Sequence, residues 1–435
     1  MSISLTAEDK KIVPEWSKDA VMYEVNIRQF TPEGTFAAFA KHLPRIKDLG
    51  VDIIWFMPIH PIGKKNRKGN LGSYYSVKDY KAVNPEFGSL EEFNALVKQI
   101  HDMDMKVIID WVANHSAFDN IWAEEGNYDW YTLDSLGRLQ PPIGTDWWDV
   151  ADLNYDNNDM QDAMIESMKF WLKTSNIDGF RCDVADWVPI SFWERCRVEL
   201  EEVKSVFMLA EAENPELHNS AFDMTYGWHL HFVMNEIAQQ KKSSLDIIEY
   251  LDIKSKEFNS SDYRLHFTSN HDENSWKGHA KERLGDAVKT FAALSSTIEG
   301  MPLLYGGQET GLDKRLAFFE KDTILWDNSE LSNFYKILFN LKKDNQALWN
   351  GDYGGNIEII SSREDSLGLA FIRSKDENKV ITIFNLSNKK IEIELNSENL
   401  KGIYVSVFTK EEKKFKDNDK LFLDPWQFYI YTNNK

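Results

Sequence analysis

Cysteine is scarce in this chain of 435 residues, which contains 2 cysteines, Cys182 and Cys196. Two thiols are too few for a scaffold held by disulfides, and they fit a reducing compartment. Long hydrophobic runs are also lacking. Apolar segments such as residues 51–59 have the length of a strand, far short of the roughly 20 residues that cross a membrane. The composition therefore excludes a disulfide scaffold and predicts no membrane span.

Positive charge is in short supply as well. Lysine and arginine total 50 against 70 aspartate and glutamate, which leaves a formal charge of −20. Such a surface repels phosphate backbones and anionic lipids, so nucleic acid and membranes are not expected partners. A neutral substrate is not disfavoured. Residues 1–16 contain no apolar signal-peptide core, which predicts a cytoplasmic location, or a periplasmic or secreted one if a signal peptide has been removed.

What is present is an alternation of short apolar segments with amphipathic ones. Several of these segments are apolar at nearly every position, as strands buried on both faces require. No repeat is visible at the level of sequence. Eight segments are predicted as strands: residues 20–30, 51–59, 106–112, 178–185, 206–212, 221–226, 263–270 and 301–309.

Helical patterns lie between these strands. Residues 89–103 begin with Ser89 as a candidate N-cap, followed by Glu91 and Glu92 in the first turn. The same apolar period recurs at 159–174, 286–298 and 332–348. Eight strands alternating with helices predict an α/β fold, a (β/α)₈ TIM barrel.

Two regions depart from this alternation. Residues 113–159, after the third strand, are rich in Asp, Asn, Gly, Pro and Trp, and a connection that long is usually functional. After residue 350 short strands follow one another without helices, which predicts a C-terminal antiparallel β-sandwich. We therefore expect a barrel of residues 1–112 and 160–350, an inserted subdomain of 113–159, and a sandwich of 351–435. The sandwich strands are predicted at 357–361, 367–374, 379–386, 390–395, 403–409 and 420–432.

Acidic residues gather at the predicted carboxyl ends of the barrel strands, where barrel enzymes keep their chemistry. A single Asp after a strand is usually a cap or a turn former. Four strands that deliver acids and bases to one rim are not explained by caps. The residues are Asp110 and His115 after the third strand, Arg181 and Asp183 after the fourth, Glu211 after the fifth, and His271 and Asp272 after the seventh.

Two carboxylates that face each other across a neutral acetal can hydrolyse a glycoside. One attacks the anomeric carbon and the other protonates the leaving oxygen. Arg181 lies two residues from Asp183 on the same strand face, so we expect it to keep Asp183 ionised. Nearby like charges would raise the pKa of Glu211, as a proton donor requires.

At these residues the sequence resembles glycoside hydrolase family 13, the α-amylase family. Each motif is weak alone, but five in the family's order on the predicted strands are specific. The match spans roughly residues 21–348, and the C-terminal β domain stands where that family carries one. The motifs are DWVANH at 110–115, ADLN at 151–154, GFRCD at 179–183, Glu211, and FTSNHD at 267–272, and residues 72–89 resemble the family's second-loop signature.

The resemblance implies roles for the site residues. Asp183 would be the nucleophile, Glu211 the general acid and base, and Asp272 a stabiliser of the transition state. Arg181, His115 and His271 would contact the sugar, Asp110 would support them, and Tyr75 would stack on the sugar ring. The implied reaction is hydrolysis of α-1,4 bonds in starch and maltooligosaccharides through a covalent glucosyl-enzyme, with retention of configuration.

The sequence also departs from the family. Many α-amylases hold a structural Ca²⁺, and Asn114 matches one of its ligands. However, Trp187 replaces a histidine ligand, Asp186 replaces the lysine before it, and the early calcium loop would fall on the basic residues 64–70. No cofactor is therefore expected to be required, and Ca²⁺ through Asn114 is the exception left open. A domain of some dimeric relatives is missing at the N-terminus, so a monomer is the default expectation.

Other functions fit the same motifs. A transglycosylase or isomerase would use the same residues, as would a neopullulanase-like enzyme that acts on α-1,6 bonds. A glucan-binding protein without activity would have lost one of the three acids, and all three are present. Trp187 and Trp276 adjoin the motifs and are predicted as platforms for sugar rings. For Trp147 and Trp148 two roles fit the sequence equally: sugar platforms, or packing within the long loop.

Overall fold

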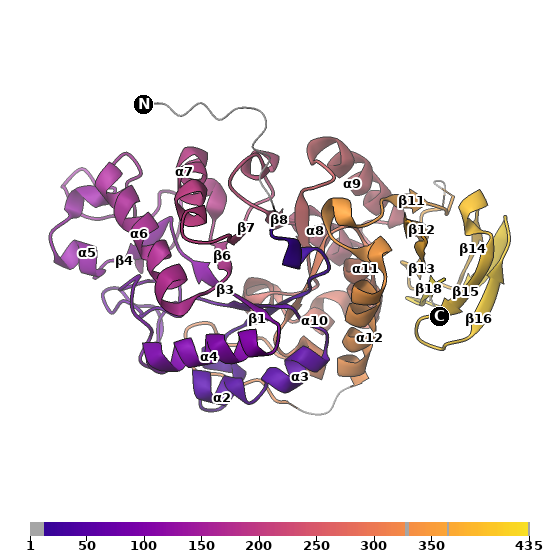
Figure 1. Ribbon diagram of the computed structural model, residues 1–435, viewed down its shortest axis with the longest axis horizontal. Coiled ribbons are helices and arrows are strands. Elements are labelled where there is room, and N and C mark those ends of the chain that lie inside the picture. The colour runs from indigo at the N-terminus through magenta and orange to yellow at the C-terminus, as the bar shows by residue number, and fades with distance from the viewer. Residues whose placement is uncertain (1–12, 327–329, 363–364, 434–435) are drawn as a thin grey trace.

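The barrel predicted from the alternation is present in the structure, a computed structural model that describes residues 13–326, 330–362 and 365–433. Its parallel strands close in the order β1-β10-β9-β8-β7-β6-β3-β2, with β10 hydrogen-bonded to β1 (Figure 1). The strands are β1 (Met22–Val25), β2 (Ile53–Phe56), β3 (Lys106–Trp111), β6 (Gly179–Cys182), β7 (Phe207–Ala210), β8 (Met224–Tyr226), β9 (Tyr263–His266) and β10 (Met301–Tyr305). Residues 1–12, in which the sequence shows no signal-peptide core, lie outside the described ranges.

The strands are shorter than the apolar segments that contain them. The prediction of one strand over residues 20–30 is wrong in its second half, which forms helix α1 (Ile27–Phe30). The change occurs at Asn26, whose side chain accepts a hydrogen bond from the Gln29 N–H at 3.3 Å and so begins the helix. An apolar run of this length does not distinguish a strand from a strand that turns into a helix.

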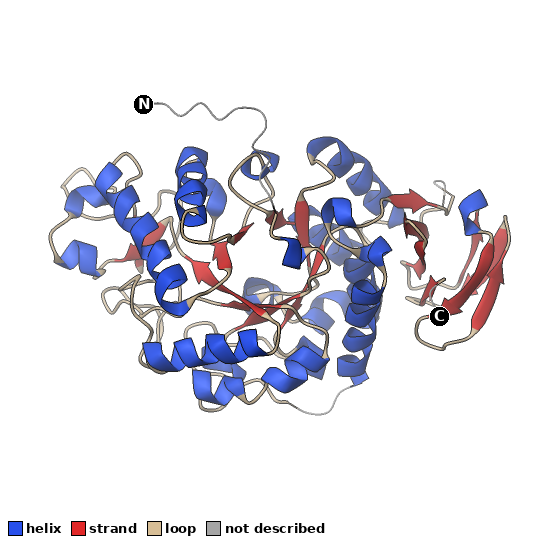
Figure 2. Cartoon of the chain, in the orientation of Figure 1, coloured by secondary structure: helices blue, strands red, loops and turns tan. Residues whose placement is uncertain are grey.

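Helices surround the barrel, as Figure 2 shows. Ser89 is the N-cap of α4 as predicted: its hydroxyl accepts from the Glu92 N–H at 3.2 Å, and the Glu92 carboxylate accepts from the Ser89 N–H at 2.8 Å. Such a cap contributes about 1 kcal/mol. The helices are α2 (Phe36–Ala40), α3 (Leu43–Asp48), α4 (Leu90–Asp102), α6 (Asn158–Ser175), α7 (Ile190–Glu201), α8 (Trp228–Ala238), α9 (Ser244–Glu257), α10 (Ala280–Leu284), α11 (Val288–Thr297) and α12 (Glu330–Asp344). Within the described residues, no helix has the length and apolar character to cross a membrane.

The barrel interior changes character along its axis. An apolar cluster that includes Met22, Ile53, Phe207 and Leu209 is fully buried inside it. Charged side chains follow toward the rim, where Glu24 on β1 and Arg181 on β6 are also fully buried. Because buried charges must be paired, the polar end of the barrel is where a site is expected.

The segment between β3 and α6 turns back onto the barrel rim. It contains β4 (His115–Ala117), α5 (Ile121–Glu124) and β5 (Val150–Asp152), and β4 pairs with β5 in antiparallel fashion. Its end is tied to the connection after β2. The Ser76 hydroxyl donates to the Asp149 carbonyl at 2.9 Å, and the Lys68 ammonium lies 3.2 Å from the Asp149 carboxylate. These contacts place residues 146–150 beside the ends of the barrel strands.

The C-terminal region consists of a six-stranded and a two-stranded antiparallel sheet that enclose an apolar core. Residues 420–432, predicted as one strand, form two, because the chain turns between them at 424–427. Strand β16 lies in the lysine-rich run 410–416, and its Phe415 is buried. The strands are β11 (Ile357–Ile359), β12 (Gly368–Lys375), β13 (Asn378–Asn385), β14 (Ile391–Leu395), β15 (Gly402–Ser406), β16 (Glu412–Phe415), β17 (Asp419–Leu423) and β18 (Phe428–Thr432).

A buried arginine joins this region to the barrel. Arg373 on β12 is 1% exposed, and its guanidinium donates to the backbone carbonyls of Ile298 and Trp349, each at 3.0 Å. The carbonyl of Ile298 lies just after helix α11, where the helix dipole favours a cation. Arg373 therefore fixes the C-terminal sheets against the barrel by contacts that are remote from its rim.

Candidate active site

The register of β3 and β6 places Asp110 directly opposite Arg181. The Arg181 guanidinium is fully buried and reaches three carboxylates. Its Nη1 donates to Asp110 Oδ1 and to Asp183 Oδ1, each at 2.9 Å, and its Nη2 lies 2.9 Å from Glu211 Oε2. The ends of three neighbouring strands, β3, β6 and β7, thus meet at one cation. The structure brings together the four residues that the sequence predicted there.

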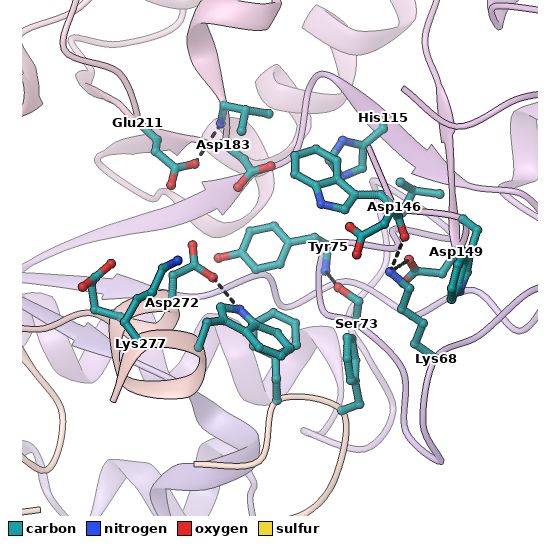
Figure 3. Close-up of a pocket in the computed structure, with 18 of the residues that line it drawn as sticks. Lys68, Ser73, Tyr75, His115, Asp146, Asp149, Asp183, Glu211, Asp272 and Lys277 are labelled. Atoms are coloured by element: carbon teal, nitrogen blue, oxygen red, sulfur yellow. Dashed lines mark hydrogen bonds and ion pairs between the residues drawn. The ribbon is translucent and has the colours of Figure 1, made fainter. Parts of the chain in front are cut away.

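The residue that follows Asp183 has a strained backbone. Val184, next to Asp183, adopts φ +37° and ψ 49°, a left-handed conformation that a β-branched residue rarely takes. Such a conformation costs of the order of 1–3 kcal/mol. It aims the Val184 N–H at Glu211 Oε2, to which it donates at 2.9 Å. Figure 3 shows this bond dashed and both carboxylates pointing into the cavity.

The two carboxyl groups differ in acidity. Burial raises the pKa of Asp183 to about 6 against the opposing effect of Arg181, and burial raises the pKa of Glu211 to about 7. We predicted that nearby like charges raise the pKa of Glu211. The charges of Asp183 and Asp272 do raise it, but burial is the larger cause. Burial therefore lets the pair of carboxyl groups retain a proton near neutral pH.

His271 joins two further carboxylates. Its Nδ1 lies 2.5 Å from Glu24 Oε1, and its Nε2 lies 2.7 Å from the Tyr75 hydroxyl and 3.4 Å from Asp272 Oδ2. Burial alone would lower the pKa of His271, but Asp272 and Glu24 raise it to about 9. The ring is therefore an imidazolium at neutral pH, and the Tyr75 hydroxyl donates onward to Asp110 Oδ2 at 3.1 Å.

Sequence reasoning missed Glu24. It lies on β1 in an otherwise apolar run, is fully buried, and provides a carboxylate for His271. A single acid inside a strand that is buried on both faces is the signal that could have identified it, because a buried charge needs a partner.

The remaining predicted residues take different environments. The Trp276 indole N–H donates to Asp272 Oδ1 at 3.2 Å from a π-helical turn, Glu273–Lys277, of a kind often found at functional sites. His115 is buried, and burial lowers its pKa to about 3, so its ring is neutral. The Trp276 ring packs at 5.1 Å from Phe318.

These side chains surround a cavity of about 1140 Å³ (Figure 3). Among the described residues that line it, Trp276 is present and Trp187 is absent. Trp187 instead stacks on Trp147, with ring centroids 5.2 Å apart at 22°, and Trp147 lines the cavity. The lining includes Tyr75, His115, Asp183, Glu211 and Asp272 together with Trp147, Trp148, Trp228, Phe232, Trp276, Phe318 and Phe319. Trp228 and Phe232 lie on helix α8, and Phe318 and Phe319 lie in the connection after β10. These four were not predicted, because their segments lie outside the motifs in sequence.

Asn114, the residue that the resemblance links to Ca²⁺, contacts the neighbouring His115. Its amide Nδ2 lies 3.2 Å from His115 Nδ1, and the side chain is buried. Calcium prefers six to eight oxygen ligands with carboxylates among them. Within the part of the chain that the structure describes, no group of three or more His, Cys, Asp or Glu side chains is placed to hold a metal ion.

Comparison with known proteins agrees with this geometry. The family model described as "Alpha amylase, catalytic domain" matches residues 10–142 and 143–348, and the model described as "Maltogenic Amylase, C-terminal domain" matches residues 357–430. The chain is 25% identical to Alpha-amylase 3 of Dictyoglomus thermophilum over 95% of this chain and 93% of that one.

Two solved structures are similar along nearly their whole length. A maltogenic α-amylase from Thermotoga neapolitana superposes with a TM-score of 0.86 at 25% identity, covering 95% of this chain and 98% of that one. An α-amylase from Lactobacillus plantarum superposes with a TM-score of 0.85 at 27% identity, covering 96% and 99%.

Proposed function

The chain belongs to glycoside hydrolase family 13, the α-amylase family, and on that premise we propose that it hydrolyses α-1,4 bonds of starch and maltooligosaccharides with retention of configuration. One observation carries the proposal. Two carboxylates of different acidity, Asp183 and Glu211, share the Arg181 guanidinium and face one cavity. That arrangement supplies a nucleophile and a proton donor to the same glycosidic bond.

The reaction proceeds in two steps. Asp183 Oδ attacks the anomeric carbon while Glu211 transfers its proton to the glycosidic oxygen, so the bond between that carbon and oxygen breaks and a shorter chain leaves. Water then attacks the glucosyl-Asp183 ester, and Glu211 accepts the water proton as the carbon–carboxylate bond breaks. Each step inverts the anomeric centre, so the product keeps the α configuration.

Other groups stabilise the charge that develops on the sugar. The imidazolium of His271 and the carboxylate of Asp272 hydrogen-bond to sugar hydroxyls, and Tyr75 stacks on the ring. Asp110 and Glu24 act through Arg181, Tyr75 and His271, and are positioning residues. Interactions that strengthen in the transition state contribute several kcal/mol. No step passes through a metal ion.

The aromatic lining supports a glucan as the substrate, because sugar C–H faces pack on aromatic rings. Trp276 and Trp147 take this role in the proposal, and the ring of Trp187 stacks on that of Trp147. The α-amylase names of the similar proteins favour α-1,4 hydrolysis. A cavity of about 1140 Å³ is also wide enough for an acceptor sugar, so transfer to a sugar hydroxyl or cleavage of α-1,6 bonds is the second candidate.

Proton NMR of the first products from maltoheptaose tests the proposal. We expect new reducing ends that form as the α-anomer before they mutarotate, and none from the Asp183→Ala variant. Pullulan, assayed separately, reports whether α-1,6 bonds are cleaved. Longer oligosaccharides without new reducing ends would contradict hydrolysis and indicate transfer. If neither maltoheptaose nor pullulan is cleaved, the proposed function is wrong.

We expect a bell-shaped dependence of kcat/KM on pH. Below the pKa of about 6 Asp183 becomes protonated and cannot attack, and above the pKa of about 7 Glu211 loses the proton that it must donate. The value of kcat/KM for maltoheptaose should therefore peak between pH 6 and 7. A rate that stays at its maximum up to pH 9 would contradict the assignment of Glu211 as the proton donor.

A further inference from the structure

A second cavity is lined by residues of the C-terminal sheets. These sheets lie at the end of the molecule away from the barrel strands (Figure 1). The volume of the cavity is about 470 Å³, within the range of sites for small ligands. It opens where the two-stranded sheet meets β18. Its lining comes from β14, β17, the turn that follows β17, and β18: Lys390, Ile391, Glu392, Phe422, Leu423, Asp424, Gln427 and Tyr429. None of these residues contributes to the active-site cavity.

Phe422 is the feature of this cavity that packing does not explain. It lies on β17 between the buried Leu421 and Leu423, so its ring points outward and is 75% exposed. The other outward positions of this small sheet carry charges, and Glu392 is its direct partner on β14. An exposed aromatic ring at the mouth of a polar cavity is the surface on which the C–H face of a sugar packs.

The charges around the ring are paired with one another. The Lys390 ammonium lies 2.8 Å from the Asp424 carboxylate, and the Lys420 ammonium lies 2.9 Å from the Glu392 carboxylate and 3.5 Å from that of Glu394. Two ammonium groups therefore face three carboxylates, which disfavours an anionic ligand. Carboxylate oxygens and ammonium groups still accept and donate hydrogen bonds, which suits a neutral ligand with many hydroxyl groups.

The turn that carries Asp424 and Gln427 is held in place. The Gln427 Oε1 accepts from the Asp424 N–H at 2.8 Å, and its Nε2 donates to the Tyr429 hydroxyl at 2.9 Å. Between them Trp426 adopts φ +56°, and its ring contacts Phe291 of helix α11 with centroids 6.1 Å apart. The polar groups of the cavity are thus fixed before a ligand arrives, which reduces the entropy that binding costs.

We propose that this cavity is a second α-glucan-binding site, in which a sugar ring stacks on Phe422 and its hydroxyls bond to Glu392, Asp424 and Gln427. The proposal rests on the proposed function for the identity of the sugar. A protein partner is disfavoured because a single exposed ring is far smaller than the apolar patches of several hundred Å² that mark such interfaces. The site would hold a long glucan whose other end enters the barrel.

A site of this kind acts through effective concentration, so it matters for substrates long enough to reach both cavities. In the full chain, Phe422→Ala should lower kcat/KM for amylopectin by about 3- to 10-fold and leave kcat/KM for maltotetraose unchanged. Phe422→Trp keeps an aromatic platform and should retain the parent's activity. Ile403→Ala is the matched control, since Ile403 is 58% exposed on β15 of the same region and does not line the cavity.

Binding is measured without turnover in the Asp183→Ala background. Calorimetric titration with maltoheptaose should give two sites per chain, and one when Phe422→Ala is added. An unchanged stoichiometry, or equal losses on amylopectin and maltotetraose, would overturn the second site while the proposed function stands. If the parent cleaves neither substrate and maltoheptaose does not bind, the proposed function fails, and the second glucan site fails with it.

Discussion

Replacing Arg181 with methionine is expected to destabilise the protein by about 3–5 kcal/mol, because the buried carboxylates of Asp110, Asp183 and Glu211 lose their shared cation. Activity should fall as well, with kcat/KM for maltoheptaose lower by about 10²–10³-fold. The reason is that Asp183 would then be protonated at neutral pH and could not attack. Urea unfolding and steady-state kinetics on the same preparation measure the two effects.

The loss of stability should grow with pH. Burial already raises the pKa values of Asp110 and Asp183 to about 6 and that of Glu211 to about 7, above their unfolded values. Such groups bind more protons in the folded state, so their contribution falls as pH rises from about 4 through the folded pKa. Without Arg181 these pKa values rise further, and the difference in unfolding free energy from the parent should be larger at pH 8 than at pH 5.

Two variants separate this effect from the loss of a buried arginine in general. Arg373→Met removes a guanidinium of equal burial whose hydrogen bonds go to backbone carbonyls, so it should cost stability but leave kcat/KM unchanged. Arg181→Lys keeps the charge, but one ammonium does not reproduce the planar fork that binds separate carboxylates. Full activity in Arg181→Met, or a stability loss that shrinks toward pH 8, would refute the role assigned to Arg181.

The barrel and its central acids could be predicted from the sequence because they depend on strands. A strand buried on both faces leaves a nearly continuous apolar run, and parallel strands of a barrel end at one rim. Asp110, Arg181, Asp183 and Glu211 follow such runs directly. Their positions at the ends of these strands therefore predict that the four side chains lie close together, whatever the conformation of the loops.

Features that depend on loops were not predictable in the same way. Trp187 adjoins the nucleophile motif in sequence, yet the turn Ala185–Trp187 leads its ring onto Trp147, which comes from the inserted segment and lines the cavity instead. The helix α1 was hidden because a single capping residue, Asn26, ends the strand inside an apolar run. A contact between distant segments decides the position of Trp187, and no local pattern records it, whereas the start of α1 depends on a cap three residues away.

Replacing Glu211 with glutamine is expected to separate substrates by their leaving groups. Methyl α-maltotrioside needs protonation of its leaving oxygen, so its kcat/KM should fall by about 10²–10⁴-fold. The 2,4-dinitrophenyl glycoside expels a stable phenolate without a proton, so its first step should remain close to the parent's rate. The amide is similar in size and can still accept the hydrogen bond from the Val184 N–H, so the fold should be kept.

The second step tests the same residue in its other role. Water attack on the glucosyl-Asp183 ester needs a base, and the glutamine of the variant cannot accept that proton. Stopped-flow absorbance should therefore show a rapid burst of one dinitrophenolate per active site followed by slow turnover. Glu309→Gln is the control, because Glu309 is a buried carboxylate that binds Tyr23 and Arg45 and does not line the cavity. Equal slowing of both glycosides by Glu211→Gln, without a burst, would show that another group donates the proton.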